Sequence, residues 1–342
     1  MFVVRPAHLQ DVPALLRMAR TVHSGNIPAD PVALEARVRR STASFLGREG
    51  DADGLYVLVL EDSTSGNVLG TSCLIAGKGG AERPRLGLRV RKREHYSSDL
   101  QTGQVQVTVQ LVRDTSGPTE VGGLVLSPAW RGTGHRLGSL LSLARFALVG
   151  LRPERFSRRM IGEIMGDLTA DGRTMLWDHL GRRFINLSYQ EADRFSRTSC
   201  EFITSLFPEG EIYVSLLPAE ARRLIGHVSP DAVPALRMLE RLGFRHSDEV
   251  DPFDGGPYLE ADRDEIPIVT ATRRVELTGL LEGSVEGAEQ LVSSPDGETF
   301  RCVRTQAVVA GDGVQISQAA ATALKIEPGA EVGLSPASVP SG

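Results

Sequence analysis

A glycine-rich segment in the middle of the chain has the residue types needed to bind a phosphate group. The run Leu124-Val-Leu-Ser-Pro-Ala-Trp-Arg131-Gly-Thr-Gly134-His-Arg136-Leu-Gly138 reads as a strand, a turn and the start of a helix. A helix that begins at such a turn has unpaired backbone N–H groups and the positive end of its dipole there, an arrangement that binds pyrophosphate. The glycines allow the phosphates to approach closely, and Arg131 or Arg136 can add positive charge. An ordinary surface turn is the alternative.

Regular elements on both sides must hold this turn in place. Residues 121–126 predict a strand that runs into Pro128, and residues 137–151 predict a helix. The other elements expected in the first 190 residues are strands over 2–5, 55–60, 68–73, 104–112, 160–164 and 184–187, and helices after Asp11 and over 175–181.

Two later segments echo each other. Residues 176–181 (LWDHLG) and 238–243 (MLERLG) both read as a helix closed by glycine, and an aromatic residue follows each, Phe184 and Phe244. We therefore interpret this region as two related αβ units.

The residue pattern changes after Pro267, where short β-like runs alternate with Gly, Pro and Asp. Residues 314–332 predict a strand, a small helix, a turn and a strand. A small β-rich unit is expected from about residue 276.

Composition excludes several classes of protein. The 342 residues are 41% hydrophobic and 24% charged, typical of a folded globular chain, and no apolar run is long enough to span a membrane. A formal charge of −5 argues against nucleic acid as a partner. Three widely spaced cysteines form neither a disulfide framework nor a zinc site, and the chain begins without a signal peptide. We expect a cytoplasmic protein without a bound metal.

The glycine-rich turn resembles the acyl-CoA signature of the GNAT N-acyltransferase superfamily, which is arginine or glutamine, two residues, glycine, one residue, then glycine or alanine. Arg131 and Gly134 match it. The third position holds Arg136, and in a lengthened turn Gly138 takes its role. The order of elements in the first 190 residues is also similar to that fold.

More narrowly, the chain resembles the arginine N-succinyltransferases of bacterial arginine catabolism. The most specific block is Phe253-Asp-Gly-Gly-Pro-Tyr-Leu-Glu260, which a general acyltransferase has no reason to carry. Further matching stretches are residues 4–6, 59–62, Glu120, Phe146, Glu163, Gly166, residues 177–184, 225–226 and 243–244.

This resemblance implies an α+β protein with three parts. Residues 1–190 form a GNAT-like acyl-CoA-binding unit, residues 191–275 a second, related αβ half-unit that completes the site, and residues 276–342 a small β-rich C-terminal domain. The implied reaction is transfer of succinyl from succinyl-CoA, a co-substrate rather than a cofactor, to the α-amine of L-arginine.

The resemblance also implies an acyl-CoA site. The strand before the turn holds the pantetheine and the thioester, and the family's CoA contact there corresponds to Leu124. A backbone N–H within residues 124–126 would stabilise the thioester oxygen. The expected acyl-CoA-binding residues are Leu124, Val125, Leu126, Arg131, Gly132, Gly134, Arg136 and Gly138.

Protonation of the departing thiolate is where the chain differs from the family. The tyrosine that many GNAT enzymes use is replaced by Trp177 or Leu239. The succinyltransferase family has a histidine after Ile-Gly and two residues, and that position holds Ser229 here, in Ile225-Gly-His-Val-Ser-Pro. If this segment is a strand, His227 faces the same side and could substitute. A surface or structural histidine is the alternative for His227.

Substrate-binding residues follow from the same resemblance. Arg89 could bind a carboxylate or be a solvated arginine, and Glu120 and Glu163 are candidate bases if they face the cleft. Asp254 and Glu260 could pair with a guanidinium, although Asp254-Gly-Gly could equally be turn chemistry. We take Arg89, Glu163, Asp254 and Glu260 as the candidate substrate residues.

Two further departures keep alternatives open. Met165 stands where the family has arginine, so the donor or acceptor could differ. Loss of the family histidine also suits a non-catalytic subunit of a heteromeric enzyme. We expect either a homo-oligomer or a heteromer with a related subunit.

Overall fold

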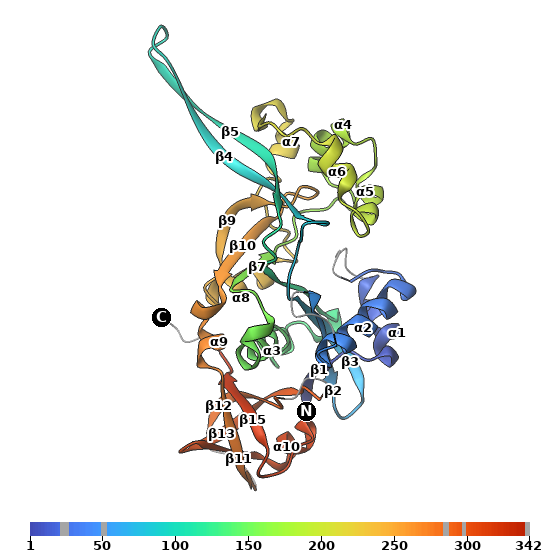
Figure 1. The fold of residues 1–342 in the computed structure, drawn as a ribbon, viewed down its shortest axis with the longest axis vertical. Helices are drawn as coiled ribbons and strands as arrows, with labels where there is room; N and C mark the ends of the chain where they lie inside the picture. The colour runs from blue at the N-terminus through green and yellow to red at the C-terminus, as the bar shows by residue number, and fades with distance from the viewer. Residues whose placement is uncertain (21–26, 49–52, 283–286, 296–298, 339–342) are drawn as a thin grey trace.

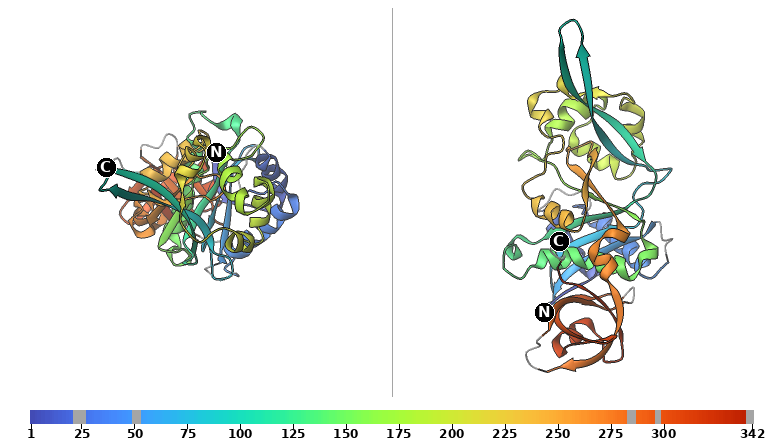
Figure 2. Two further views of the ribbon diagram at one scale, coloured as in Figure 1. Left: turned by 90° about the horizontal axis from the view of Figure 1, so that it is seen from above. Right: turned by 90° about the vertical axis from the view of Figure 1, so that its left-hand side faces the viewer.

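The computed structural model describes residues 1–20, 27–48, 53–282, 287–295 and 299–338. The chain folds into an elongated molecule of strands and helices (Figures 1 and 2). Its strands are β1 Phe2–Pro6, β2 Leu55–Asp62, β3 Asn67–Ile75, β4 Arg85–Ser97, β5 Thr102–Asp114, β6 Thr119–Leu126, β7 Arg159–Glu163, β8 Ile212–Tyr213, β9 Arg245–Val250, β10 Pro257–Asp262, β11 Arg273–Leu281, β12 Ala288–Ser293, β13 Cys302–Ala310, β14 Gly313–Ser317 and β15 Glu331–Pro336. Its α-helices are α1 Val12–Ala19, α2 Pro31–Phe45, α3 Leu137–Leu151, α4 Arg182–Phe184, α5 Tyr189–Ser196, α6 Glu201–Leu206, α7 Ala219–Arg222, α8 Val233–Arg241, α9 Pro267–Ala271 and α10 Gln318–Leu324.

A twisted sheet runs through the centre in the order β1-β2-β3-β6-β7-β10-β9-β4-β5-β8. Its neighbouring strands are antiparallel except for β6 and β7, which are parallel. The parallel pair is the place where the chain crosses over through α3.

Helices cover the two faces of this sheet. Helix α3 is apolar on nearly every side and is buried against one face, where Leu141, Phe146 and Val149 contact the sheet core. Helices α1 and α2 cover the opposite face, and their apolar stripes, including Leu15 and Leu34, pack on β2 and β3. The candidate cleft opens on the face of the sheet that carries α2.

Strands β4 and β5 continue beyond the sheet as a long hairpin, drawn in teal at the top of Figure 1. At its base, Leu88 and Val109 are fully buried in a second core that also contains residues of the segment from α4 to α7. Toward the tip both strands become polar, and the apolar Tyr96 and Leu100 are 68% and 75% exposed.

Strands β11 to β15 close into a small barrel at the other end of the molecule (Figure 1). Each strand has two neighbours because β12 pairs with both β15 and β13. Residues 313–336 form strand, helix, turn and strand, which confirms the expected order. The barrel joins the central sheet where Val3 and Val4 of β1 pair with Val303 and Cys302 of β13.

Several local predictions are confirmed, including the 55–75 hairpin, the helix over 137–151 and the strand near 160–164. The predicted strand over 184–187 is wrong. Helix α4 ends at Phe184, and Ile185 is buried among helices, where no strand edge is available for pairing. Among the described residues, no helix is long and apolar enough to cross a membrane.

The segment with His227 and Ser229 is also not a strand. It is a turn followed by irregular backbone, in which the His227 N–H donates to Leu224 O and the Ser229 N–H donates to Met165 O. The prediction that residues 227 and 229 share one face of a strand is therefore wrong.

The domain boundaries at 190 and 275 remain predictions, because all three segments contribute strands to one continuous series of pairings.

Candidate active site

The parallel strands β6 and β7 separate soon after they meet. They pair only at Thr119–Met160 and Glu120–Ile161. Beyond that point β6 stays with β3, whereas β7 stays with β10. The sheet therefore has a V-shaped gap, and the backbone of residues 121–126 has no strand partner on the β7 side.

A bulge bends β6 inside this gap. The β3–β6 register jumps from Cys73–Gly122 to Thr71–Val125, so Gly123 and Leu124 together face one residue of β3. Gly123 has φ +59°, a conformation that glycine adopts without strain. The bulge turns Leu124 and Leu126 toward the α3 core, while Val125 packs toward α1 and α2.

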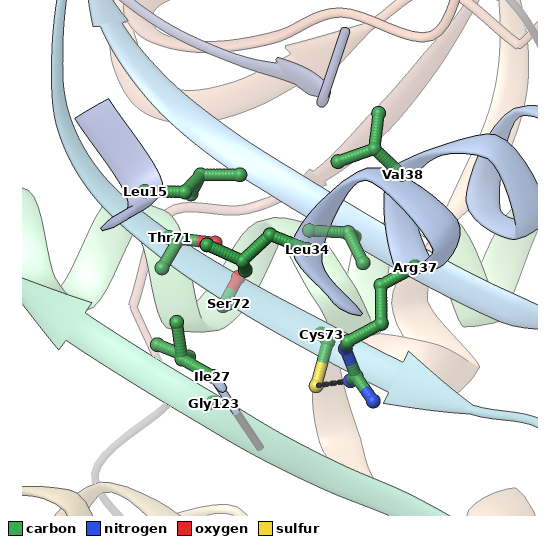
Figure 3. A pocket seen from close by; sticks show the side chains of 10 residues that line it. Leu15, Ile27, Leu34, Arg37, Val38, Thr71, Ser72, Cys73 and Gly123 are labelled. Atoms are coloured by element: carbon green, nitrogen blue, oxygen red, sulfur yellow. Dashed lines mark hydrogen bonds between the residues drawn. The ribbon is translucent and has the colours of Figure 1, made fainter. Parts of the chain in front are cut away.

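A small apolar cavity lies beside the bulge, between α1, α2 and β3 (Figure 3). It is lined by Leu15, Leu34 and Gly123, and Arg37 Nη2 lies 3.9 Å from Cys73 Sγ at its edge. With a volume of ≈ 10 Å³ it has room for about one water molecule, so it holds no substrate.

The glycine-rich turn follows β6 directly and ends at the N-terminus of α3. Gly132, Gly134 and Arg136 all have positive φ, and a Cβ atom added at either glycine would meet only open space. The turn is thus exposed and open to a ligand. Arg131 braces it, because its Nε donates to Leu126 O at 3.1 Å. Gly138 lies in the first turn of α3 and is partly exposed.

The barrel contacts this turn. Arg136 Nη1 lies 2.9 Å from Glu289 Oε2 on β12. Arg304 of β13 donates to Arg136 O at 3.2 Å and to Ser139 Oγ at 3.1 Å. The guanidinium of Arg136 is therefore paired with the barrel rather than free at the turn.

A cleft of ≈ 1250 Å³ opens on the face of the sheet that carries α2. Its lining comes from α2, the loop over residues 76–84, the end of β7, α5 and the loop over 251–254. Charged groups from all of these segments enter it, so the cleft can hold a polar substrate with several charges.

The inner end of the cleft is rich in carboxyl groups. Asp251, Asp254 and Glu163 all line it, and burial is the largest cause raising the pKa of each. Asp254 Oδ1 accepts the Gly256 N–H at 2.8 Å, and Asp251 Oδ2 accepts the Tyr258 hydroxyl at 3.1 Å. Asp254 thus combines the predicted turn role with a place in the cleft.

Two residues that sequence patterns did not single out, Lys78 and Arg85, add positive charge to the cleft. Lys78 contacts Glu120 and Glu163, and Tyr258 stacks under Arg85, whose Nη2 is 2.7 Å from Glu249. For Lys78, the sequence did hold a signal that could have identified it, since it is one of only three lysines in the chain.

Other predicted substrate residues lie outside the cleft. Arg89 pairs with Glu249 at 2.9 Å and with Asp248 at 3.6 Å. Glu260 pairs with Arg159, and both line a separate pocket of ≈ 510 Å³. Met165, which replaces the family's arginine, does line the cleft.

The two candidate proton donors also do not line it. His227 Nε2 is 2.9 Å from Asp167 Oδ2, and its side chain is 50% exposed. His227 and Asp167 border a separate pocket of ≈ 600 Å³. Ser229 is nearer the cleft through its backbone bond to Met165.

The chain matches known protein families along nearly its whole length. Residues 2–268 match the model of the arginine N-succinyltransferase beta subunit, and residues 273–336 match that of its C-terminal domain. Arginine N-succinyltransferases from Escherichia fergusonii and Escherichia coli K12 are each 33% identical over 337 residues, covering 98% of this chain and 97% of theirs.

A solved structure has the same fold. Arginine/ornithine succinyltransferase subunit AI from Pseudomonas aeruginosa is 30% identical, covers 99% of both chains and superposes with a TM-score of 0.85. The similarity therefore includes the barrel and the hairpin as well as the acyltransferase sheet.

Proposed function

This chain belongs to the arginine N-succinyltransferase family, and we propose that it transfers the succinyl group of succinyl-CoA to the α-amine of L-arginine. The gap between β6 and β7 supports this proposal best, because it separates an open phosphate-type turn from an acid-lined cleft. A donor and an acceptor can meet at this gap from opposite layers of the molecule.

Succinyl-CoA is the donor and a co-substrate, with no metal needed for direct attack of the amine. Its pyrophosphate would lie at the N-terminus of α3, against the backbone N–H groups around Gly132 and Gly134. Its pantetheine would follow the unpaired side of β6. The bulge at Gly123 and Leu124 would offer a backbone N–H to the thioester oxygen, which gains negative charge as the amine attacks.

L-Arginine is the acceptor, and the cleft suits its two positively charged groups. Carboxyl groups at the inner end, Asp251, Asp254 and Glu163, can attract the ammonium and the guanidinium. Arg89 and Glu260 are already paired with other charges and do not belong to this acceptor site.

Purified protein mixed with succinyl-CoA and L-arginine, monitored for free thiol, tests the proposal. We expect thiol release that depends on both substrates, with succinylarginine as the product. A panel of acyl-CoAs against arginine, ornithine and lysine measures which donor and acceptor the enzyme prefers, the choice that Met165 leaves open. Absence of thiol release with every pair would contradict the proposal for this chain acting alone, and a repeat with a related subunit tests a heteromer.

A further inference from the structure

Glu163 lies at the edge of the gap in the sheet. It is the last residue of β7, beyond the point where that strand separates from β6, and its side chain is 22% exposed at the inner end of the cleft. The gap through which a thioester would reach the cleft begins two residues earlier, at Ile161. An amine that attacks the thioester from the cleft would therefore lie beside this carboxyl group.

A lysine and a second carboxylate hold this side chain. Lys78 Nζ is 2.6 Å from Glu120 Oε2 and 3.9 Å from Glu163 Oε2. Glu120 is fully buried on β6, one residue before the gap, so it anchors the lysine from inside the sheet. Lys78 therefore bridges the two strands that form the gap.

The charged groups around Glu163 affect its ionisation in both directions. Lys78 and Arg85 favour the carboxylate, while Glu120 and Asp251 oppose it, and Tyr258 is its cross-strand neighbour on β10. Burial outweighs the cations and raises the pKa of Glu163 to about 7. A carboxyl group with that pKa can accept and release a proton near neutral pH.

We propose that Glu163 is the general base that deprotonates the α-ammonium group of the acceptor, and that Lys78 and Glu120 are positioning residues for its carboxylate. This inference rests on the proposed acyl transfer. It assigns the base to a side chain in the cleft rather than to the segment around His227.

Proton transfer to Glu163 begins the reaction. One ammonium N–H proton moves to a Glu163 carboxylate oxygen, which leaves a neutral amine with a free electron pair. That pair forms the C–N bond at the thioester carbon, and collapse of the tetrahedral adduct breaks the C–S bond. The second proton of the attacking nitrogen ends on the departing thiolate, and Glu163 releases its own proton to solvent through the open cleft.

The test is the pH dependence of kcat/KM for the amine in wild type and variants. Wild-type activity should rise with pH through a midpoint near the pKa of Glu163, about 7, because only the carboxylate accepts a proton. Glu163→Gln should lower kcat/KM at pH 7 by about 10²-fold or more and remove this midpoint. Its deficit should shrink toward pH 9, where an α-amine with an ordinary pKa of about 8 is already neutral.

Two neighbouring variants should move the midpoint in opposite directions. Glu120→Gln removes a negative charge that faces Glu163 and should lower the midpoint. Lys78→Met removes a positive charge and should raise it, and Lys78→Arg should restore it. If Lys78→Met does not fold, Glu120→Gln and Lys78→Arg still decide the matter.

Glu276→Gln, at an exposed site on the barrel, is the matched control and should leave the profile unchanged. Wild-type activity that survives in Glu163→Gln with its midpoint intact would overturn this inference and leave acyl transfer standing. An inactive wild type would instead contradict the proposed function.

Discussion

The candidate groups for proton transfer lie in two places. Glu163 is in the cleft with its lysine partner, whereas His227 borders a separate pocket and Ser229 lines neither of the two. Ser229 is a far weaker acid than imidazole at neutral pH. His227 is held by Asp167 at 2.9 Å, a pairing that orients the ring and leaves the other ring nitrogen available.

His227→Ala tests whether this imidazole protonates the thiolate. We expect turnover to fall by about 10²-fold if the ring donates the proton, with KM for both substrates little changed. Steady-state thiol release measures both constants.

Ser229→Ala is the companion variant, and Asp167→Asn removes only the orienting carboxylate. Unchanged turnover in His227→Ala would remove this histidine from the mechanism. A loss confined to Ser229→Ala would point instead to the hydroxyl or to a water that it holds.

At the level of elements, the phosphate-type turn depends on the barrel. Arg136 takes a left-handed conformation at the start of α3, and the barrel holds both its carbonyl and its side chain. Arg304 supplies the carbonyl contact from β13 and is 9% exposed. The barrel thus shapes the candidate acyl-CoA site without lining the cleft.

Arg304→Ala should loosen this turn. We expect KM for succinyl-CoA to rise about 5- to 10-fold, which corresponds to the ~1 kcal/mol of a hydrogen bond, while KM for the amine stays constant. Arg304→Lys should fall between, since an ammonium cannot reproduce the planar fork.

Arg273→Ala, at an exposed barrel position, is the control for loss of charge. An equal rise in both KM values would mean that Arg304 supports the whole fold rather than the turn.

On the scale of the whole molecule, part of the barrel packs into the hydrophobic core of the acyltransferase sheet, while the interior of the barrel forms a core of its own. Leu291, Phe300 and Cys302 belong to the same cluster as α3 residues such as Leu140 and Phe146. The pairing of β1 with β13 continues the contact through the backbone. The C-terminal unit is therefore expected to fold together with the rest.

Phe300→Ala should destabilise the entire molecule by about 3–5 kcal/mol, because a fully buried ring leaves a cavity in the shared core. Chemical denaturation followed by circular dichroism should still show one transition, shifted to lower denaturant. Phe195→Ala removes a ring that is 51% exposed and should change stability far less. Two separate transitions in Phe300→Ala would show that the barrel unfolds independently.

The sequence alone determined the features that depend on local pattern. The strand, glycine turn and helix over 121–151 appeared because β-rich residues, φ-permissive glycines and an apolar helix follow one another directly. The family resemblance was carried by short motifs that need no knowledge of the fold. Strand β4 was not predicted, because its outer half, RVRKREHYS, is charged on both faces and projects into solvent.

Only the tertiary structure decided which side chains meet. Lys78, Glu120 and Glu163 are separated by more than 40 residues at each step, and they come together because β3, β6 and β7 are neighbours in the sheet. The same folding pairs Arg89 and Glu260 with other charges, away from the cleft. Burial also raises the pKa of Glu163, and burial is a property of the packed molecule rather than of the residue.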